Sequence, residues 1–122
     1  MKIMESAENY LETIYVLGKK NGSVRSIDVA NELGFTKPSV SVAMKNFREE
    51  GYITVNEEGA LKLTDKGLEI ALRVYERHEI LAKALMALGV DEETAYDDAC
   101  KIEHHISDAS IEKIKEHFKG NL

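Results

Sequence analysis

Residues 34–51 read GFTKPSVSVAMKNFREEG, and they carry the signals for both ends of a helix. Thr36 or the next residue is suited to the N-cap, and Pro38 fits the first turn, where its missing N–H breaks no hydrogen bond. Gly51 is typical of the position just after a helix. The segment 36–48 holds three basic residues and no acid, so this helix would be locally cationic and suited to contact an anion.

A shorter helix is predicted directly before this one, from Ser26 to Leu33, and Gly34 would end it. Two helices joined by a tight turn, the second of them basic, form the helix-turn-helix pattern. Residues 52–55 and 61–63 then have strand character and predict a small hairpin, the wing. A helical domain with an incidental hairpin would not explain the basic helix. The predicted core residues are Val29, Ala30, Leu33, Val40, Met44 and Phe47.

Outside the wing, the chain is predicted to be mainly α-helical. A first helix spans about Ser6 to Lys20, with Ser6 as its N-cap. Its acids Glu5 and Glu8 are expected to face water near the positive end of the helix dipole. The same explanation fits Glu12 less well, because it lies further from that end.

Three helices are predicted in the second half of the chain. The longest is capped near Thr64 and ends at Gly89, and the others begin at Asp91 and at Ser107 or Asp108. These three helices alone cannot cover all of their apolar surface, and a two-fold homodimer would bury the remainder. Pairing would also place two helix-turn-helix motifs on a palindromic DNA operator. The expected apolar stripe of the long helix is Leu68, Ala71, Leu72, Tyr75, His78, Ala82, Leu85 and Met86.

Length and composition limit the classes of protein. The 122 residues suffice for one or two small folding units but not for a large catalytic cavity. No apolar run approaches the roughly 20 residues of a membrane span, and the start lacks a signal peptide, so a soluble, cytoplasmic protein is expected. The net charge of −6 argues against unspecific binding of polyanions by the whole chain. Acidity is concentrated in residues 67–122, which hold twelve acids and seven bases.

Residues 97–105 read DDACKIEHH and place a thiol, a carboxylate and imidazoles close together. Positions i, i+3 and i+4 share a helix face, so Cys100, Glu103 and His104 would point the same way. Their S, O and N donors suit a transition-metal ion better than calcium or magnesium. The only cysteine of the chain could equally be a small buried hydrophobe beside an ordinary polar face. Spacing alone leaves these two interpretations equal.

Five stretches together carry a family resemblance: ENYLETIY (8–15), TKPSVSVAMKNFREEG (36–51), LTDKG (63–67), YERHE (75–79) and CKIEHH (100–105). In this combination the chain resembles the metal-dependent repressors of the diphtheria toxin repressor family, especially its manganese transport regulator branch. The resemblance implies a winged helix-turn-helix DNA-binding domain at 1–66. It further implies a long helix leading into an all-helical metal-binding and dimerisation domain at 67–122.

The match to this family is mixed at individual positions. Cys100 follows the iron branch, whereas the manganese branch has Glu there. Position 9 is usually Asp in the manganese branch and Met in the iron branch. Ala82 and Tyr96 replace the carboxylate and histidine of the iron branch's second site, which is therefore expected to be absent in that form, and the chain ends before the SH3-like third domain of many iron-branch members. The metal ligands that the resemblance implies are Glu12, His78, Cys100, Glu103 and His104, with the amide of Asn9 as a further candidate.

The identity of the regulatory ion stays open between several metals. The resemblance implies Mn²⁺ or Fe²⁺. A thiolate ligand favours iron, cobalt, nickel or zinc over manganese, and affinity alone favours zinc. His105 is rotated by about 100° from the arc of the implied ligands, so it is expected near the site or on the surface. His117 is expected on the surface.

DNA contacts are expected along the basic helix. Lys45 and Arg48 lie towards its C-terminal half and should contact phosphates, whereas Pro38 offers apolar contact to a thymine methyl group. Val42 offers no hydrogen bond to a base, so the operator sequence cannot be inferred. The residues expected to contact DNA are Arg25, Thr36, Lys37, Pro38, Ser39, Ser41, Lys45 and Arg48.

Two other functions are alternatives to a metal-dependent repressor. One is a winged-helix regulator whose ligand-like residues form an ordinary core, with regulation by another signal. The other is a metal-dependent enzyme that uses Glu103 as a base and a metal-bound water. The sequence has no Gly-rich phosphate loop, nucleophile elbow or His-Glu-x-x-His pattern, so a protein without enzymatic activity is expected.

Overall fold

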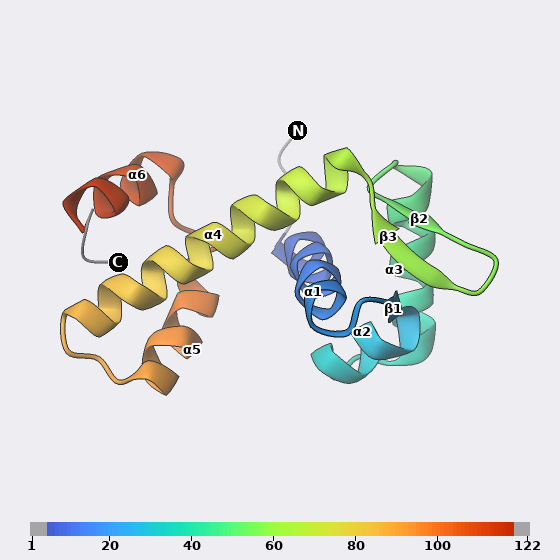
Figure 1. Cartoon of the computed structure of the whole chain (residues 1–122), viewed down its shortest axis with the longest axis horizontal. Helices are drawn as coiled ribbons and strands as arrows, with labels where there is room; N and C mark the ends of the chain where they lie inside the picture. Colours follow the sequence, from blue (N-terminus) through green and yellow to red (C-terminus); the bar gives the residue numbers. More distant parts are fainter. Residues whose placement is uncertain (1–4, 119–122) are drawn as a thin grey trace. The chain divides into compact units, whose positions relative to one another are not determined.

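The computed structural model describes residues 5–118 (Figure 1). The chain forms two compact units, Met1–Leu72 and Arg73–Leu122. The long helix α4 (Asp65–Ala87) begins in the first unit and continues in the second. Within the described residues, no helix has the length and apolar character needed to cross a membrane.

Helix α1 (Glu5–Asn21) opens the first unit. Because α1 already includes Glu5, Ser6 lies inside the helix, and the prediction that Ser6 caps it is wrong. Glu8 is only 8% exposed, so the expectation that it faces water is also wrong. The reason is its position three residues before the fully buried Leu11, which places both on the same helix face. The side chain of Glu5 falls outside the described part of the structure.

The helix-turn-helix consists of α2 (Ser26–Leu33) and α3 (Lys37–Glu49). Gly34 ends α2 in the left-handed conformation, at φ +71°, which a residue with a side chain adopts only with strain. The Thr36 hydroxyl accepts a hydrogen bond from the Ser39 N–H and caps α3. The predicted bounds of α2 are confirmed, and Thr36 is the N-cap of α3.

The wing is a three-stranded antiparallel sheet, with strand order β1-β3-β2 (Figure 1). Strands β2 (Ile53–Val55) and β3 (Ala60–Leu63) form the predicted hairpin. Strand β1 (Val24–Arg25) pairs with β3 and was not predicted. Two residues are too few to show the alternating pattern of a strand, so only the pairing of Val24 with Leu61 defines β1.

The core of the first unit lies between α1, the helix-turn-helix and the sheet. Phe47 of α3 has its ring centroid 5.6 Å from that of Tyr10 and 6.3 Å from that of Tyr52, both at edge-on angles. Of the six predicted core residues of this region, five are buried and Leu33 is half-buried. The buried five are Val29, Ala30, Val40, Met44 and Phe47.

The start of α4 is held closely against the wing. The Thr64 hydroxyl donates to the Gly51 carbonyl at 2.6 Å and accepts from the Gly67 N–H at 3.2 Å. A Cβ at Gly67 would lie 2.1 Å from the Tyr52 carbonyl oxygen. Only glycine permits so close an approach between this helix turn and the backbone before β2.

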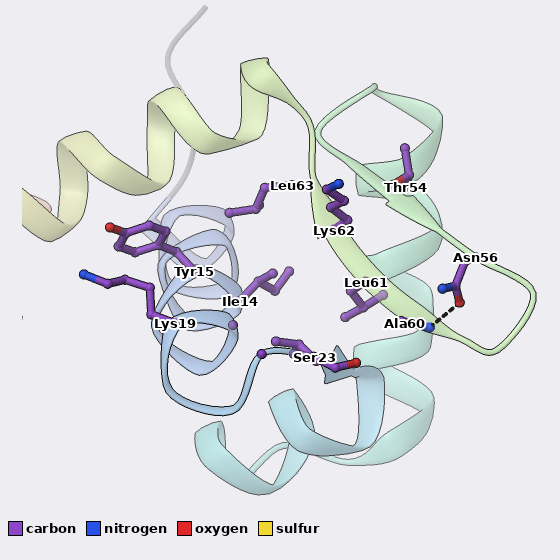
Figure 2. Close-up of a pocket in the computed structure, with 13 residues that line it drawn as sticks. Ile14, Tyr15, Lys19, Ser23, Thr54, Asn56, Ala60, Leu61, Lys62 and Leu63 are labelled. Carbon is purple, nitrogen blue, oxygen red and sulfur yellow. Dashed lines mark hydrogen bonds between the residues drawn. The ribbon is translucent and has the colours of Figure 1, made fainter.

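A groove of about 530 Å³ lies between α1 and the sheet (Figure 2). Figure 2 shows Lys19 and Tyr15 on the helix side and Lys62 and Thr54 on the strand side. The Lys19 ammonium lies 5.4 Å from the centroid of the Tyr15 ring. The groove is lined by neither the predicted metal ligands nor the predicted DNA contacts.

The second unit packs α5 (Glu92–Ile102) and α6 (Asp108–His117) against the C-terminal part of α4 (Figure 1). The stripe predicted for α4 is partly wrong, because Leu72 is 41% exposed whereas the unpredicted Val74 is buried. Residues of α4 belong to two separate cores, so a single stripe does not describe its buried residues. The core of the second unit consists of Ile80, Leu81, Ala82, Ala99 and Ile111.

The two shorter helices of this unit have the predicted N-caps. The Ser107 hydroxyl accepts from the Ser110 N–H at 3.1 Å, and the Asp91 carboxylate accepts from the Thr94 N–H at 3.0 Å. This hydrogen bond from Thr94 holds the pKa of Asp91 below its ordinary value.

The lowered pKa of Asp91 predicts a pH dependence of stability. The stabilisation should be complete above the unfolded pKa of about 3.9 and lost as the pH falls through the lower folded pKa. Asp91→Asn keeps a capping oxygen but does not titrate. We therefore expect the difference in Tm between wild type and this variant to shrink between about pH 5 and about pH 2 in thermal scans. A difference that is constant across this range would contradict the prediction.

Candidate metal centre and DNA-binding helix

A buried carboxylate lies at the centre of the candidate site. Glu103 is the C-cap of α5, and its side chain is 0% exposed. The Nδ1 atom of His78, from α4, lies 3.1 Å from one carboxylate oxygen of Glu103. The Nε2 atom of His104 lies 3.2 Å from the other oxygen. The structure thus brings together three of the predicted metal ligands within the second unit.

These three side chains fit a divalent transition metal. Carboxylate oxygen and imidazole nitrogen are ligands that manganese, iron, cobalt, nickel and zinc accept. Burial of an ionised carboxylate is costly, and a divalent cation at this position would add positive charge beside Glu103. Glu103, His78 and His104 could therefore hold such an ion.

Cys100 differs from Glu103 in exposure, although both lie near the end of α5. The residue is exposed, whereas Glu103 is buried. The interpretation of Cys100 as a small buried hydrophobe is therefore wrong. Helix α5 ends at Ile102, and His104 lies in the following turn, so the expected single helical face is not continuous. That Cys100 binds metal stays a prediction.

The two remaining candidate ligands lie on α1, in the first unit. Asn9 and Glu12 are both half-buried and are three residues apart, so they share a helix face. The assignment of metal-binding roles to them rests on the family resemblance and stays a prediction.

Ala82 and Tyr96 occupy the positions at which the iron branch has ligands of its second metal site, and both have other surroundings here. Ala82 is fully buried in the core of the second unit. The Tyr96 hydroxyl donates to a carboxylate oxygen of Glu79 at 3.1 Å. Burial, together with the negative charge of Glu79, raises the pKa of Tyr96, so the hydroxyl stays protonated. His105 and His117 are exposed, as expected for surface residues.

Arg77 is a feature of this region that the sequence patterns did not predict. It precedes His78 on α4, and it is buried although it is charged. Its guanidinium donates to the Asp108 carboxylate at 2.6 Å and to the Ile106 carbonyl. The available sequence signal was an arginine inside a mainly apolar helix, directly beside a candidate ligand.

All eight residues that were predicted to contact DNA are exposed. On α3 they lie outside the buried set of Val40, Met44 and Phe47. The Thr36 hydroxyl also donates to the Ser39 hydroxyl at 2.8 Å, so both side chains are ordered at the start of this helix. Val42 is 62% exposed on the same helix. The helix therefore presents a cationic and hydroxyl-bearing surface to solvent, and the individual contacts stay predictions.

Two domain models of iron-dependent repressors match consecutive parts of the chain. The N-terminal DNA-binding domain matches residues 2–61, and the metal-binding and dimerisation domain matches residues 64–120. The chain belongs to the iron-dependent repressor family. The family resemblance, the mainly helical winged-helix fold and the expectation of a regulator rather than an enzyme are thereby confirmed.

Individual relatives support the same assignment to the iron-dependent repressor family. The HTH-type transcriptional regulator MntR of Lysinibacillus sphaericus is 38% identical over 89% of this chain and 78% of its own length. An uncharacterized HTH-type transcriptional regulator of Methanocaldococcus jannaschii is 34% identical over 97% of this chain and 98% of its own. A solved manganese-dependent transcriptional repressor in complex with manganese is 27% identical, with a TM-score of 0.83 over 91% of this chain. The chain spans about half (51%) of the length of that repressor.

Proposed function

We propose that this chain is a repressor that binds a palindromic DNA operator as a homodimer, in the cytoplasm, when Mn²⁺ or Fe²⁺ is bound. The observation that carries the proposal is the buried Glu103 carboxylate between His78 and His104. Residues 1–66 would bind DNA, and residues 67–122 would bind metal and dimerise. A dimer interface in the second unit would bury apolar side chains such as Leu88 and Ile102, which are exposed.

The proposed ligands divide between the two units. Glu103 binds the ion, and His78 and His104 add nitrogen ligands beside it. A bound divalent ion supplies positive charge that offsets the carboxylates. Glu12 would bind from α1, and without metal it would repel Glu103 if the two carboxylates came close. The complete proposed set is Asn9, Glu12, His78, Cys100, Glu103 and His104.

Metal would favour DNA binding by ordering the protein beforehand. With Glu12 bound to the same ion as the second unit, the spacing of the two recognition helices in a dimer is fixed before DNA arrives. DNA then binds without the free-energy cost of that ordering, so its affinity rises. The coupling must be reciprocal, so DNA should raise metal affinity by the same factor.

The decisive experiment is a DNA-binding titration with chelated protein. Duplexes selected from a random library by metal-loaded protein would serve as the probe, at one fixed salt concentration. Mn²⁺, Fe²⁺, Co²⁺, Ni²⁺ and Zn²⁺ would be added back separately. We expect Mn²⁺ or Fe²⁺ to raise DNA affinity and the selected duplexes to contain an inverted repeat. Equal affinity with and without every metal would instead support a winged-helix regulator that responds to another signal.

The charged residues of α3 predict the salt dependence of DNA binding. Lys45→Ala and Arg48→Ala should each weaken binding to all sequences about equally, because phosphate contacts carry no sequence information. Each should also reduce the slope of log K against log salt by about 1. The control is Lys113→Ala, which removes one exposed positive charge from α6 of the second unit. An unchanged slope in both α3 variants would contradict the predicted phosphate contacts.

A further inference from the structure

Arg77 connects α4 to the segment between α5 and α6. Its Nη1 atom donates to the carboxylate of Asp108, the first residue of α6, and Nη2 donates to the carbonyl of Ile106 in the connecting turn. All three residues belong to the second unit. A buried guanidinium is costly unless it has such partners, so this arrangement defines one position of the turn.

The turn held by Arg77 carries the candidate ligands. Ile106 follows Glu103 by three residues and His104 by two. Backbone hydrogen bonds from Glu103 to Ala99 and from Ile106 to Ile102 fix the turn to α5, the helix it leaves. Arg77, one residue before His78, joins the same turn to α4 as well. The guanidinium therefore joins the helix that presents His78 to the segment that follows Glu103 and His104.

We propose that Arg77 is a positioning residue of the metal centre, which holds the Glu103–His104 turn against α4 so that His78 and Glu103 are arranged before an ion binds. This inference rests on the proposed function, because it requires those side chains to bind metal. Partners that orient metal ligands typically change metal affinity by about 10- to 100-fold when they are removed.

A second ion pair in the same unit provides a matched control. The Lys115 ammonium lies 2.7 Å from the Glu76 carboxylate, so this pair also joins α4 to the C-terminal helix. Glu76 directly precedes Arg77, but both members of its pair are more than half exposed. Exposed pairs contribute little, and the hydrogen bond of this pair joins α4 to α6 and not to the turn that holds Ile106. Glu76→Gln should therefore leave metal binding unchanged.

The test compares Arg77→Met, Arg77→Lys and Glu76→Gln with wild type. We expect Arg77→Met to bind Mn²⁺ about tenfold more weakly or worse in calorimetric titrations. Arg77→Lys keeps the charge but has a single ammonium in place of the fork, so its loss should be smaller. Thermal unfolding of the metal-free proteins gives their stability. The absorption spectrum of the Co²⁺-saturated proteins reports the geometry of the metal ligands. A variant that is only less stable should have the wild-type spectrum.

The possible results separate this inference from the proposed function. Weaker Mn²⁺ binding together with a changed Co²⁺ spectrum in Arg77→Met supports the positioning role. A folded Arg77→Met protein with wild-type affinity and spectrum overturns it. If Arg77→Met does not fold, Arg77→Lys decides in the same way, since wild-type affinity and spectrum there would overturn the role. A wild-type chain that binds neither ion would instead refute the proposed function.

Discussion

Gly67→Ala should lower the free energy of unfolding by about 3 kcal/mol or more, at the upper end of the range for overpacked sites. The added Cβ would lie 2.1 Å from the Tyr52 carbonyl oxygen and 3.0 Å from its carbonyl carbon. Backbone atoms cannot move aside as the end of a flexible side chain can. The start of α4 would have to shift, and the hydrogen bond from the Thr64 N–H to the Tyr52 carbonyl would be strained or lost.

Gly18→Ala is the matched control for this prediction. Gly18 also lies within a helix, but a Cβ there would be 3.6 Å from a Val24 methyl carbon, an ordinary contact. Alanine is favoured over glycine in a helix by up to about 1 kcal/mol, so this variant should be as stable as wild type or more stable. Denaturant unfolding of the two variants gives the comparison. Similar midpoints for both would show that the approach of α4 to the wing is not as close as described.

The elements that the sequence predicted well are those with local signals. Gly34, Pro38 and Gly51 define the ends of α2 and α3 through the chemistry of their own backbone, and those helices formed where expected. The two-residue strand β1 depends on pairing with a strand more than 30 positions away, so no local pattern indicates it. The approach of Gly67 to Tyr52 is likewise a tertiary contact, which residue type alone does not reveal.

In the candidate metal site, too, the sequence predicted some features and not others. Glu103 and His104 were identified by their residue types and spacing, and the family resemblance added His78; these three side chains do come together. Burial was less predictable, because Cys100 is exposed and Glu8 is buried. Pattern arguments rank residues by polarity, whereas burial depends on which helix packs over them. The two partners of Arg77 lie about 30 residues further along the chain, so its role had no local signal either.

Glu103→Gln should lower the affinity for Mn²⁺ by about 100-fold or more, because it replaces a charged direct ligand by a neutral amide. Loss of a partner that only orients a ligand already lowers metal affinity by up to about that factor. Glutamine has nearly the shape of glutamate but no charge, so it cannot offset the charge of a cation. Metal should consequently no longer raise DNA affinity. Calorimetric titration with Mn²⁺ and DNA binding with and without the ion measure the two effects. The control is His105→Gln, at an exposed histidine near Glu103 in the sequence. It should bind Mn²⁺ and DNA as wild type does.

The same substitution should act on stability in the opposite direction. The Glu103 side chain is fully buried, and an ionised carboxylate carries a desolvation cost there that a neutral amide of similar shape does not. Metal-free Glu103→Gln should therefore unfold at the temperature of metal-free wild type or above it. A carboxylate retained for stability alone would show the reverse, with a lower unfolding temperature and an unchanged response to Mn²⁺. The opposite signs of the two effects thus distinguish a residue kept for metal binding from one kept for the fold.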